Sequence, residues 1–128
     1  MTKKIFVSLP MRGKEQYEIK ERMQHLFKLA SAYLDEECEL IDSLNPVYTE
    51  ELQNNNVVDI APLYLGASIK LLSQADLVIF DKDWMAAEGC RIEKQVCDTY
   101  RIKHIVEPEL LGTFKASLSY NLETERDY

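Results

Sequence analysis

Apolar and polar positions along the chain follow two different periods. Short runs rich in apolar residues predict strands that are buried in a sheet, and these runs occupy 5–8, 38–41, 76–81 and 103–106. Between them, apolar side chains recur at steps of three and four residues, as in amphipathic helices. This pattern predicts helices over 15–36, 63–74 and 89–100.

Alternating strands and helices predict an α/β fold with right-handed crossovers. We expect a doubly wound, three-layer, flavodoxin-like sheet of about four or five mostly parallel strands. Ligands bind such sheets at the carboxyl ends of the strands. The loops that meet there are 8–14, 42–59, 81–89 and the segment from 107 onward. The polar loop over 44–59 is long enough to favour a functional role.

Composition and charge limit the class of protein. The chain has 128 residues, the length of one domain, and a net charge of −7. This charge disfavours nucleic acid and membrane surfaces as partners, because both attract positively charged proteins. A small anionic ligand stays compatible with it, since such a ligand needs only a local cluster of hydrogen-bond donors.

No targeting or membrane segment is expected from the sequence. The first apolar run is too short for a signal peptide, whose hydrophobic region takes ~7–15 residues, and no run approaches the ~18–20 residues of a membrane span. Cys38, Cys90 and Cys97 are odd in number and form no CxxC pair. We therefore expect reduced thiols and a cytoplasmic protein.

The loop after the first strand carries the first candidate chemistry. Ser8 and Arg12 lie between a strand and a helix, and the free N–H groups of a helix start can join such side chains in a phosphate site. The alternative is an ordinary turn with a solvated arginine. Neither a dinucleotide fingerprint nor a P-loop is present, so no cofactor is expected.

The helix over 89–100 carries the second candidate. Glu93 lies one turn after Gly89, so both can face the carboxyl edge of the sheet while Ile92 and Val96 pack inward. A glycine lets a ligand approach the backbone closely. A carboxylate beside it can attack or stabilise a cationic sugar carbon. The alternative is a solvated surface glutamate.

Two aromatic residues flank the same predicted edge. Trp84 has the ring to stack on a nucleobase, or it is a half-buried loop residue, and Tyr64 lies at the start of a helix. No metal site is expected, because Cys90 and Cys97 have no further cysteine or histidine at ligand spacing.

Several motifs in order resemble those of nucleoside 2-deoxyribosyltransferase-like proteins, and more closely the small phage and bacterial family DUF4406. They are IFVSLPMRG over 5–13, YLG over 64–66, LLSQADLVIF over 71–80, then Trp84, and GCRIE over 89–93. The resemblance implies a nucleoside or nucleotide pocket at the carboxyl edge of the sheet. It also implies a homo-oligomer.

The resemblance also implies roles for individual residues. Glu93 matches the glutamate that attacks the anomeric carbon of deoxyribose, and Ser8, Arg12 and Gly13 match in type the first loop of a phosphate-preferring branch. Ser68 departs from the pattern, because it stands where those relatives carry an aspartate.

The missing aspartate bears on catalysis, because a second acidic group helps the base to depart. The candidates for that role are three aspartates that end a strand or follow one, Asp42, Asp81 and Asp83. Asp81 and Asp83 are preferred, since they lie close in sequence to Gly89.

Two functions follow from these residues. One is an enzyme that cleaves or transfers the N-glycosidic bond of a deoxynucleoside or its 5′-monophosphate. The other is a protein on the same scaffold that binds a nucleotide without turning it over. Residues 1–108 form the expected domain in both cases, and 109–128 form a tail that is either an interface segment or a loosely packed end.

Overall fold

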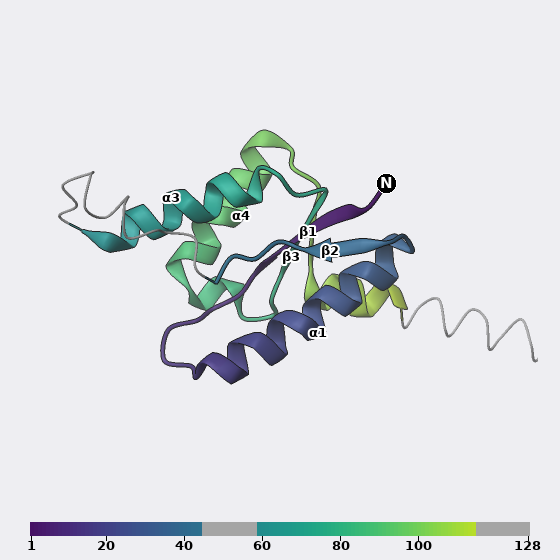
Figure 1. The fold of residues 1–128 in the computed structure, drawn as a ribbon, viewed down its shortest axis with the longest axis horizontal. Helices are drawn as coiled ribbons and strands as arrows, with labels where there is room; N and C mark the ends of the chain where they lie inside the picture. Colours follow the sequence, from purple (N-terminus) through teal and green to yellow (C-terminus); the bar gives the residue numbers. More distant parts are fainter. Residues whose placement is uncertain (45–58, 115–128) are drawn as a thin grey trace, which may run out of the picture.

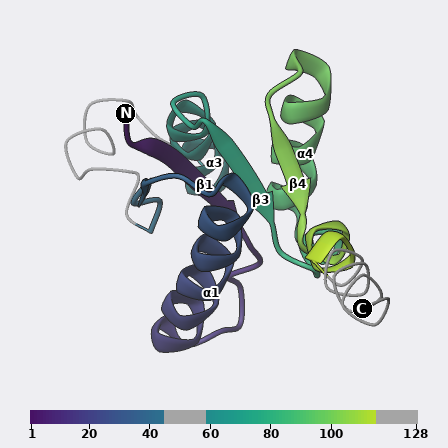
Figure 2. The ribbon, with the colours of Figure 1, turned by 90° about the vertical axis from the view of Figure 1, so that its right-hand side faces the viewer.

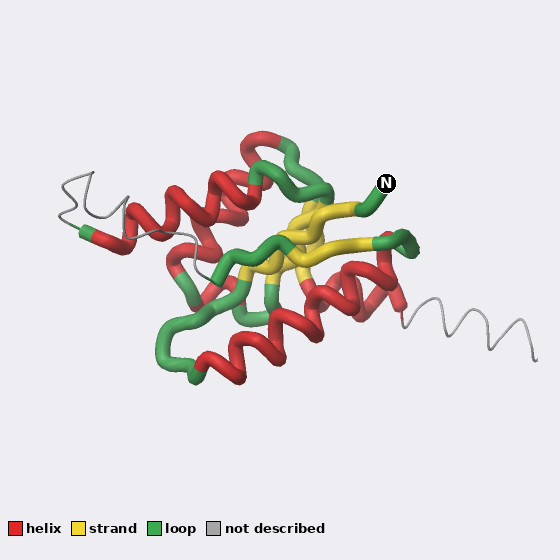
Figure 3. The backbone as a smooth tube through the Cα atoms, in the orientation of Figure 1, coloured by secondary structure: helices red, strands yellow, loops and turns green. Residues whose placement is uncertain are grey.

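The computed structural model describes residues 1–44 and 59–114, which fold around a four-stranded sheet (Figures 1 and 3). Its elements in chain order are β1 (Lys3–Ser8), α1 (Gln16–Leu34), β2 (Cys38–Leu40), α3 (Ile60–Leu72), β3 (Leu77–Phe80), the short 3-10 helix η1 (Trp84–Ala86), α4 (Glu88–Tyr100) and β4 (His104–Val106). The backbone is helical again directly after β4, over 107–114.

The strands pair in the order β2-β1-β3-β4, and every pair is parallel. Ile5 in β1 stands between Leu40 of β2 and Leu77 of β3. The chain therefore winds first to one side of β1 and then to the other, as in three-layer, flavodoxin-like folds, and the predicted α/β class is confirmed. In such a sheet a crevice opens where the winding reverses, outside the carboxyl ends of β1 and β3.

Each face of the sheet is covered by its own helices (Figure 2). Alternate residues of a strand point to opposite faces, so Ile5 and Val7 pack against α1 while Phe6 packs toward α3 and α4. The second face holds the fully buried side chains of Leu72 from α3 and Cys97 from α4. Helices on both faces explain why 5–7 in β1 and the whole of β3 are apolar.

The predicted strands and helices are all present, with shifted ends. Helix α3 begins earlier than the predicted range of 63–74, because the Asp59 side chain accepts a hydrogen bond from the N–H of Ala61 at 3.1 Å and caps the helix. Pro62 lies in the first turn of α3, where the absence of its N–H costs nothing.

Two described elements were not predicted, the short 3-10 helix η1 and the helix over 107–114. Pro108 is expected to end the last strand, but in the structure it lies in the first turn of a new helix. Leu110 on this helix is fully buried in the core beneath α1. The packed unit therefore continues beyond residue 108.

Most of the predicted polar loop over 44–59 and most of the predicted tail over 109–128 lie outside the described residues. Within the two described stretches, 1–44 and 59–114, no helix combines the length and the apolar character needed to cross a membrane.

Candidate functional site

An open pocket of about 1170 Å³ lies at the carboxyl edge of the sheet. Its lining comes from the end of β1 and the loop after it, the segment after β2, the start of α3, and η1 with the first turns of α4. This is the crevice expected at the winding reversal, and its volume lies slightly above the roughly 300–1,000 Å³ typical of small-molecule sites.

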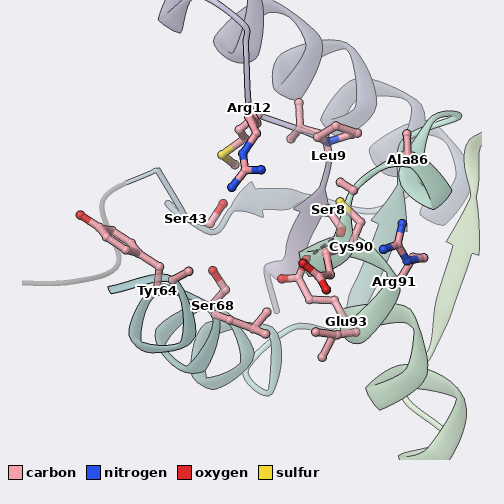
Figure 4. A pocket seen from close by; sticks show the side chains of 18 of the residues that line it. Ser8, Leu9, Arg12, Ser43, Tyr64, Ser68, Ala86, Cys90, Arg91 and Glu93 are labelled. Atoms are coloured by element: carbon pink, nitrogen blue, oxygen red, sulfur yellow. Dashed lines mark hydrogen bonds between the residues drawn. The ribbon is translucent and has the colours of Figure 1, made fainter. Parts of the chain in front are cut away.

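Glu93 is the buried acid of this pocket. It projects from α4, is only 7% exposed, and accepts a 2.8 Å hydrogen bond at Oε1 from the hydroxyl of Ser8 (Figure 4). Ser8 ends β1 and is 2% exposed. No hydrogen bond to Glu93 Oε2 is formed by the described residues. The carboxyl group is thus held at one oxygen and available at the other.

The surroundings of Glu93 change its acidity. Burial raises the pKa of its carboxyl group from the ordinary 4.5 to about 7, and the hydrogen bond from Ser8 opposes the rise. Near neutral pH the group is therefore present in both its charged and its neutral form. A carboxyl group with a pKa near the working pH, set in a cleft, is typical of a functional site.

Cys90 lies on the same helix, one turn before Glu93, and also lines the pocket. Burial raises the pKa of its thiol to about 11, and the nearby carboxyl group of Glu93 adds to the rise. The thiol is therefore neutral and a weak nucleophile near pH 7. Near pH 7 Cys90 is therefore a weaker candidate nucleophile than the partly charged carboxyl group of Glu93.

The loop after β1 differs from the expected phosphate cradle. Arg12 and Lys14 line the pocket, but no residue of α1 does. The loop passes through Gly13 at φ 80° before α1 begins. Gly13 itself is not part of the lining. The single hydroxyl proton of Ser8 is directed to Glu93. Arg12 is thus the residue of the predicted cradle that faces the pocket unpaired within the described chain (Figure 4).

The starts of two helices reach the pocket, and that of α4 has no side-chain cap, unlike that of α3, which Asp59 caps. Gly89 and Cys90 line the pocket at the start of α4. The guanidinium of Arg91 donates to the carbonyl of Met85 at 2.7 Å and so ties η1 to α4. The start of α4, with its partial positive charge, therefore lies beside the ligand space.

One packing prediction for α4 is wrong. Val96 packs on the core, as expected, but Ile92 is 40% exposed and lines the pocket rim. The cause is the orientation of the helix, which directs Glu93, Cys90 and Cys97 inward. Ile92 precedes Glu93 and is rotated about 100° away from it, toward the opening.

The start of α3 forms the opposite wall. Tyr64 and Ser68, both candidate ligand-binding residues, line the pocket, and Tyr64 is 41% exposed at its rim. Figure 4 shows Ser68 directed toward the pocket from one turn further along the helix. Ser68 therefore stands on the ligand side, where the resemblance implies an aspartate.

The remaining predicted site residues divide into two groups. Asp83 lines the pocket, whereas Asp42, Asp81 and Trp84 do not. Asp42 accepts a 3.1 Å hydrogen bond from the N–H of Leu44 in a local turn. Trp84 packs edge-on against Phe80, with Lys94 over its ring at 5.5 Å.

Asp81 belongs to a separate buried cluster that sequence reasoning missed. It is 1% exposed and accepts a 2.6 Å hydrogen bond from Arg22 of α1, which also pairs with Glu107. Glu107 in turn accepts a 3.0 Å hydrogen bond from the backbone N–H of Lys82. The cluster fixes the start of the loop that leads from β3 to the pocket. No local pattern could reveal it, because Arg22 reads as one of many exposed charges on α1.

A second residue that the sequence did not single out is Ser43. It follows β2, is 5% exposed and lines the pocket, and its hydroxyl has no hydrogen-bond partner in the described chain. Within residues 1–44 and 59–114, no group of three or more His, Cys, Asp or Glu side chains has an arrangement that could hold a metal ion.

Comparison with known proteins adds no family to these observations. No protein-family model matches the chain, and no curated protein matches it significantly. The resemblance to nucleoside 2-deoxyribosyltransferase-like proteins therefore stays a prediction that rests on the motifs quoted above.

Proposed function

We propose that this protein cleaves or transfers the N-glycosidic bond of a deoxynucleoside or its 5′-monophosphate, with Glu93 as the nucleophile. The observation that carries the proposal is the buried carboxyl group of Glu93, held at Oε1 by Ser8 inside an open pocket. A pKa of about 7, raised by burial, leaves a substantial charged fraction at neutral pH. The position of Glu93 on α4, one turn after Gly89, agrees with the resemblance.

The chemistry proceeds in two displacements. An oxygen of the Glu93 carboxylate bonds to the anomeric carbon while the bond from that carbon to the base nitrogen breaks, and the electron pair leaves with the base, which takes up a proton. The glycosyl ester is then opened by water, which gives hydrolysis, or by a second base, which gives transfer. Glu93 is released as a carboxylate in both cases.

Other pocket residues support the departure of the base and the hold on the substrate. Asp83 is the predicted second acid that lines the pocket, and Arg12 supplies a positive charge for a phosphate or for an oxygen of the base. Ser8 acts on Glu93 through their 2.8 Å hydrogen bond. Tyr64 offers an aromatic face at the pocket rim.

A protein that binds the nucleotide without turning it over is the second candidate. Ser68 favours it, because a hydroxyl on the pocket wall cannot protonate a departing base at neutral pH as a carboxylic acid can. Under this alternative the neutral form of Glu93 donates a hydrogen bond to the ligand.

One experiment separates the two candidates. The protein is incubated with deoxynucleosides and with their 5′-monophosphates, and free base is followed by chromatography while binding is followed by calorimetry. Release of base supports the enzyme. Saturable binding without release, lost in Arg12→Ala, supports the binding protein, and the absence of both overturns the nucleotide assignment.

We also propose a cytoplasmic location and a homo-oligomer. Cys38, Cys90 and Cys97 are all free thiols, which suits a reducing compartment. The oligomer rests on the resemblance alone. Size-exclusion chromatography with light scattering tests it directly.

A further inference from the structure

Ser43 is a buried polar residue whose hydroxyl is not used by the described chain. The residue is 5% exposed, and its Oγ makes no hydrogen bond within residues 1–44 and 59–114. Buried hydroxyl groups are nearly always paired, so an exception needs an explanation. Ser43 also lines the pocket, and Figure 4 shows its oxygen on the side that faces Arg12. The missing partner is therefore to be sought in the pocket.

Arg12 provides a second donor on the same wall. It comes from the loop after β1, while Ser43 follows β2, and these two strands are neighbours in the sheet. Arg12 forms no ion pair with a described residue, and its guanidinium points into the pocket (Figure 4). A hydroxyl beside a guanidinium suits a ligand group that only accepts hydrogen bonds.

Glu93 lies on a different side of the pocket. It reaches the pocket from α4, which follows β3, and β1 separates β3 from β2 in the sheet. A ligand whose sugar carbon contacts Glu93 therefore directs another of its groups toward Arg12 and Ser43. The chemistry of that group is set by the two donors.

We propose that Ser43 and Arg12 together bind an acceptor oxygen of the ligand, either a carbonyl of the base or a phosphoryl oxygen, and that Ser43 thereby determines specificity. The proposal rests on the proposed function for the class of ligand. A ligand with an amino group at this place can donate to Ser43 Oγ, but it leaves the Arg12 guanidinium, which only donates, without an acceptor. Sites built from polar groups reject such ligands strongly.

The test uses calorimetry with deoxyinosine, deoxyadenosine and the 5′-monophosphate of each. Ser43→Ala is expected to weaken binding about tenfold, the effect of losing one hydrogen bond to a ligand. A loss confined to the two deoxyinosine ligands identifies a carbonyl oxygen as the partner. A loss confined to the two monophosphates identifies a phosphoryl oxygen.

Two readouts make the test specific to a ligand-binding hydroxyl. Ser43→Ala is expected to leave the urea midpoint of the ligand-free protein unchanged or higher, because its Oγ has no partner in the described chain. The matched control is Ser31→Ala, which removes a hydroxyl that donates to the carbonyl of Phe27 at 2.9 Å on α1, outside the pocket. Its affinities are expected to equal those of the unaltered protein.

Each other result has a definite meaning. Unchanged affinity of Ser43→Ala for all four ligands, or a lowered urea midpoint, overturns the role of Ser43 and leaves the proposed function standing. Weaker binding without any release of base supports Ser43 and contradicts the enzyme. An unaltered protein that binds none of the four overturns the proposal for Ser43, and the assay with all deoxynucleosides described above then decides the proposed function.

Discussion

The hydroxyl of Ser8 at the end of β1 donates a 2.8 Å hydrogen bond to Oε1 of Glu93 on α4. Both residues are buried, and both line the pocket. The bond joins the two elements on either side of the winding reversal, and it fixes the carboxyl group by one oxygen. It also favours the charged form of Glu93 against the stronger effect of burial.

Glu93 makes the stability of the protein depend on pH. Because its folded-state pKa of about 7 lies above the ordinary 4.5, its contribution to stability is complete below about pH 4.5 and is lost as pH rises through about 7. Relative to Glu93→Gln, which stays neutral, the unaltered protein is expected to lose on the order of 3 kcal/mol of unfolding free energy across this window. Urea titrations of both proteins from about pH 5 to about pH 8 measure the difference. A constant difference contradicts the raised pKa.

Removal of the Ser8 hydroxyl is expected to raise the pKa of Glu93 further. Hydrogen bonds to charged groups contribute about 1.5–3 kcal/mol, so Ser8→Ala shifts the titration upward by roughly one to two pH units. Carbon-13 NMR of the Glu93 side chain reports the midpoint whether or not the protein is an enzyme. Ser31→Ala is the control, because Ser31 lies on α1 outside the pocket, and its Glu93 titration midpoint is expected to equal that of the unaltered protein. An equal midpoint in Ser8→Ala means that the hydrogen bond does not stabilise the carboxylate.

Gly89 and Gly66 form a matched pair of helical glycines. A Cβ atom at Gly89 meets only Leu65 Cδ1 at 3.9 Å, and one at Gly66 meets nothing within 4 Å, so alanine fits at both. Each substitution is expected to stabilise its helix by up to about 0.5–1 kcal/mol. Gly89 lines the pocket and Gly66 does not. Only Gly89→Ala should weaken ligand binding in calorimetry, and equal affinities in the two variants contradict a close approach of the ligand to Gly89.

Removal of the Arg22 side-chain charge is expected to lower the stability of the protein strongly. Arg22→Leu leaves Asp81 and Glu107, which are 1% and 3% exposed, without their cation. Uncompensated buried charges typically cost about 3–5 kcal/mol, which urea unfolding detects. Arg22→Lys retains the charge and should be intermediate, while Lys20→Met, at an exposed position on the same helix, should change little. A loss for Arg22→Leu as small as that for Lys20→Met shows that the cluster does not stabilise the fold.

The fold could be predicted because its signals are local. Strands buried on both faces need continuous apolar runs, and 77–80 is wholly buried in the structure. The period of α1 also places Met23 and Leu26 in the core, as observed. The helix over 107–114 was missed because a proline usually ends an element, and only the burial of Leu110 shows that the chain continues to pack.

The site could be predicted only in part, because its geometry depends on long-range packing. The position of Glu93 follows from helical spacing relative to Gly89, and the structure places both residues at the pocket. Asp81 directly follows β3 at the correct edge, yet it pairs with Arg22 and is not part of the pocket lining. Ser43 carried no signal in the sequence, because a serine after a strand is common and only its missing hydrogen bond distinguishes it.

The rate of base release by Glu93→Gln compared with the unaltered protein tests the central claim most directly. The amide cannot form the glycosyl ester, so the rate is expected to fall on the order of a thousandfold or more, as when other enzymes lose their nucleophile. Glu21→Gln, the same change at an exposed position of α1, is expected to retain the full rate. Release of base by Glu93→Gln at the rate of the unaltered protein would contradict the assignment of Glu93 as the nucleophile.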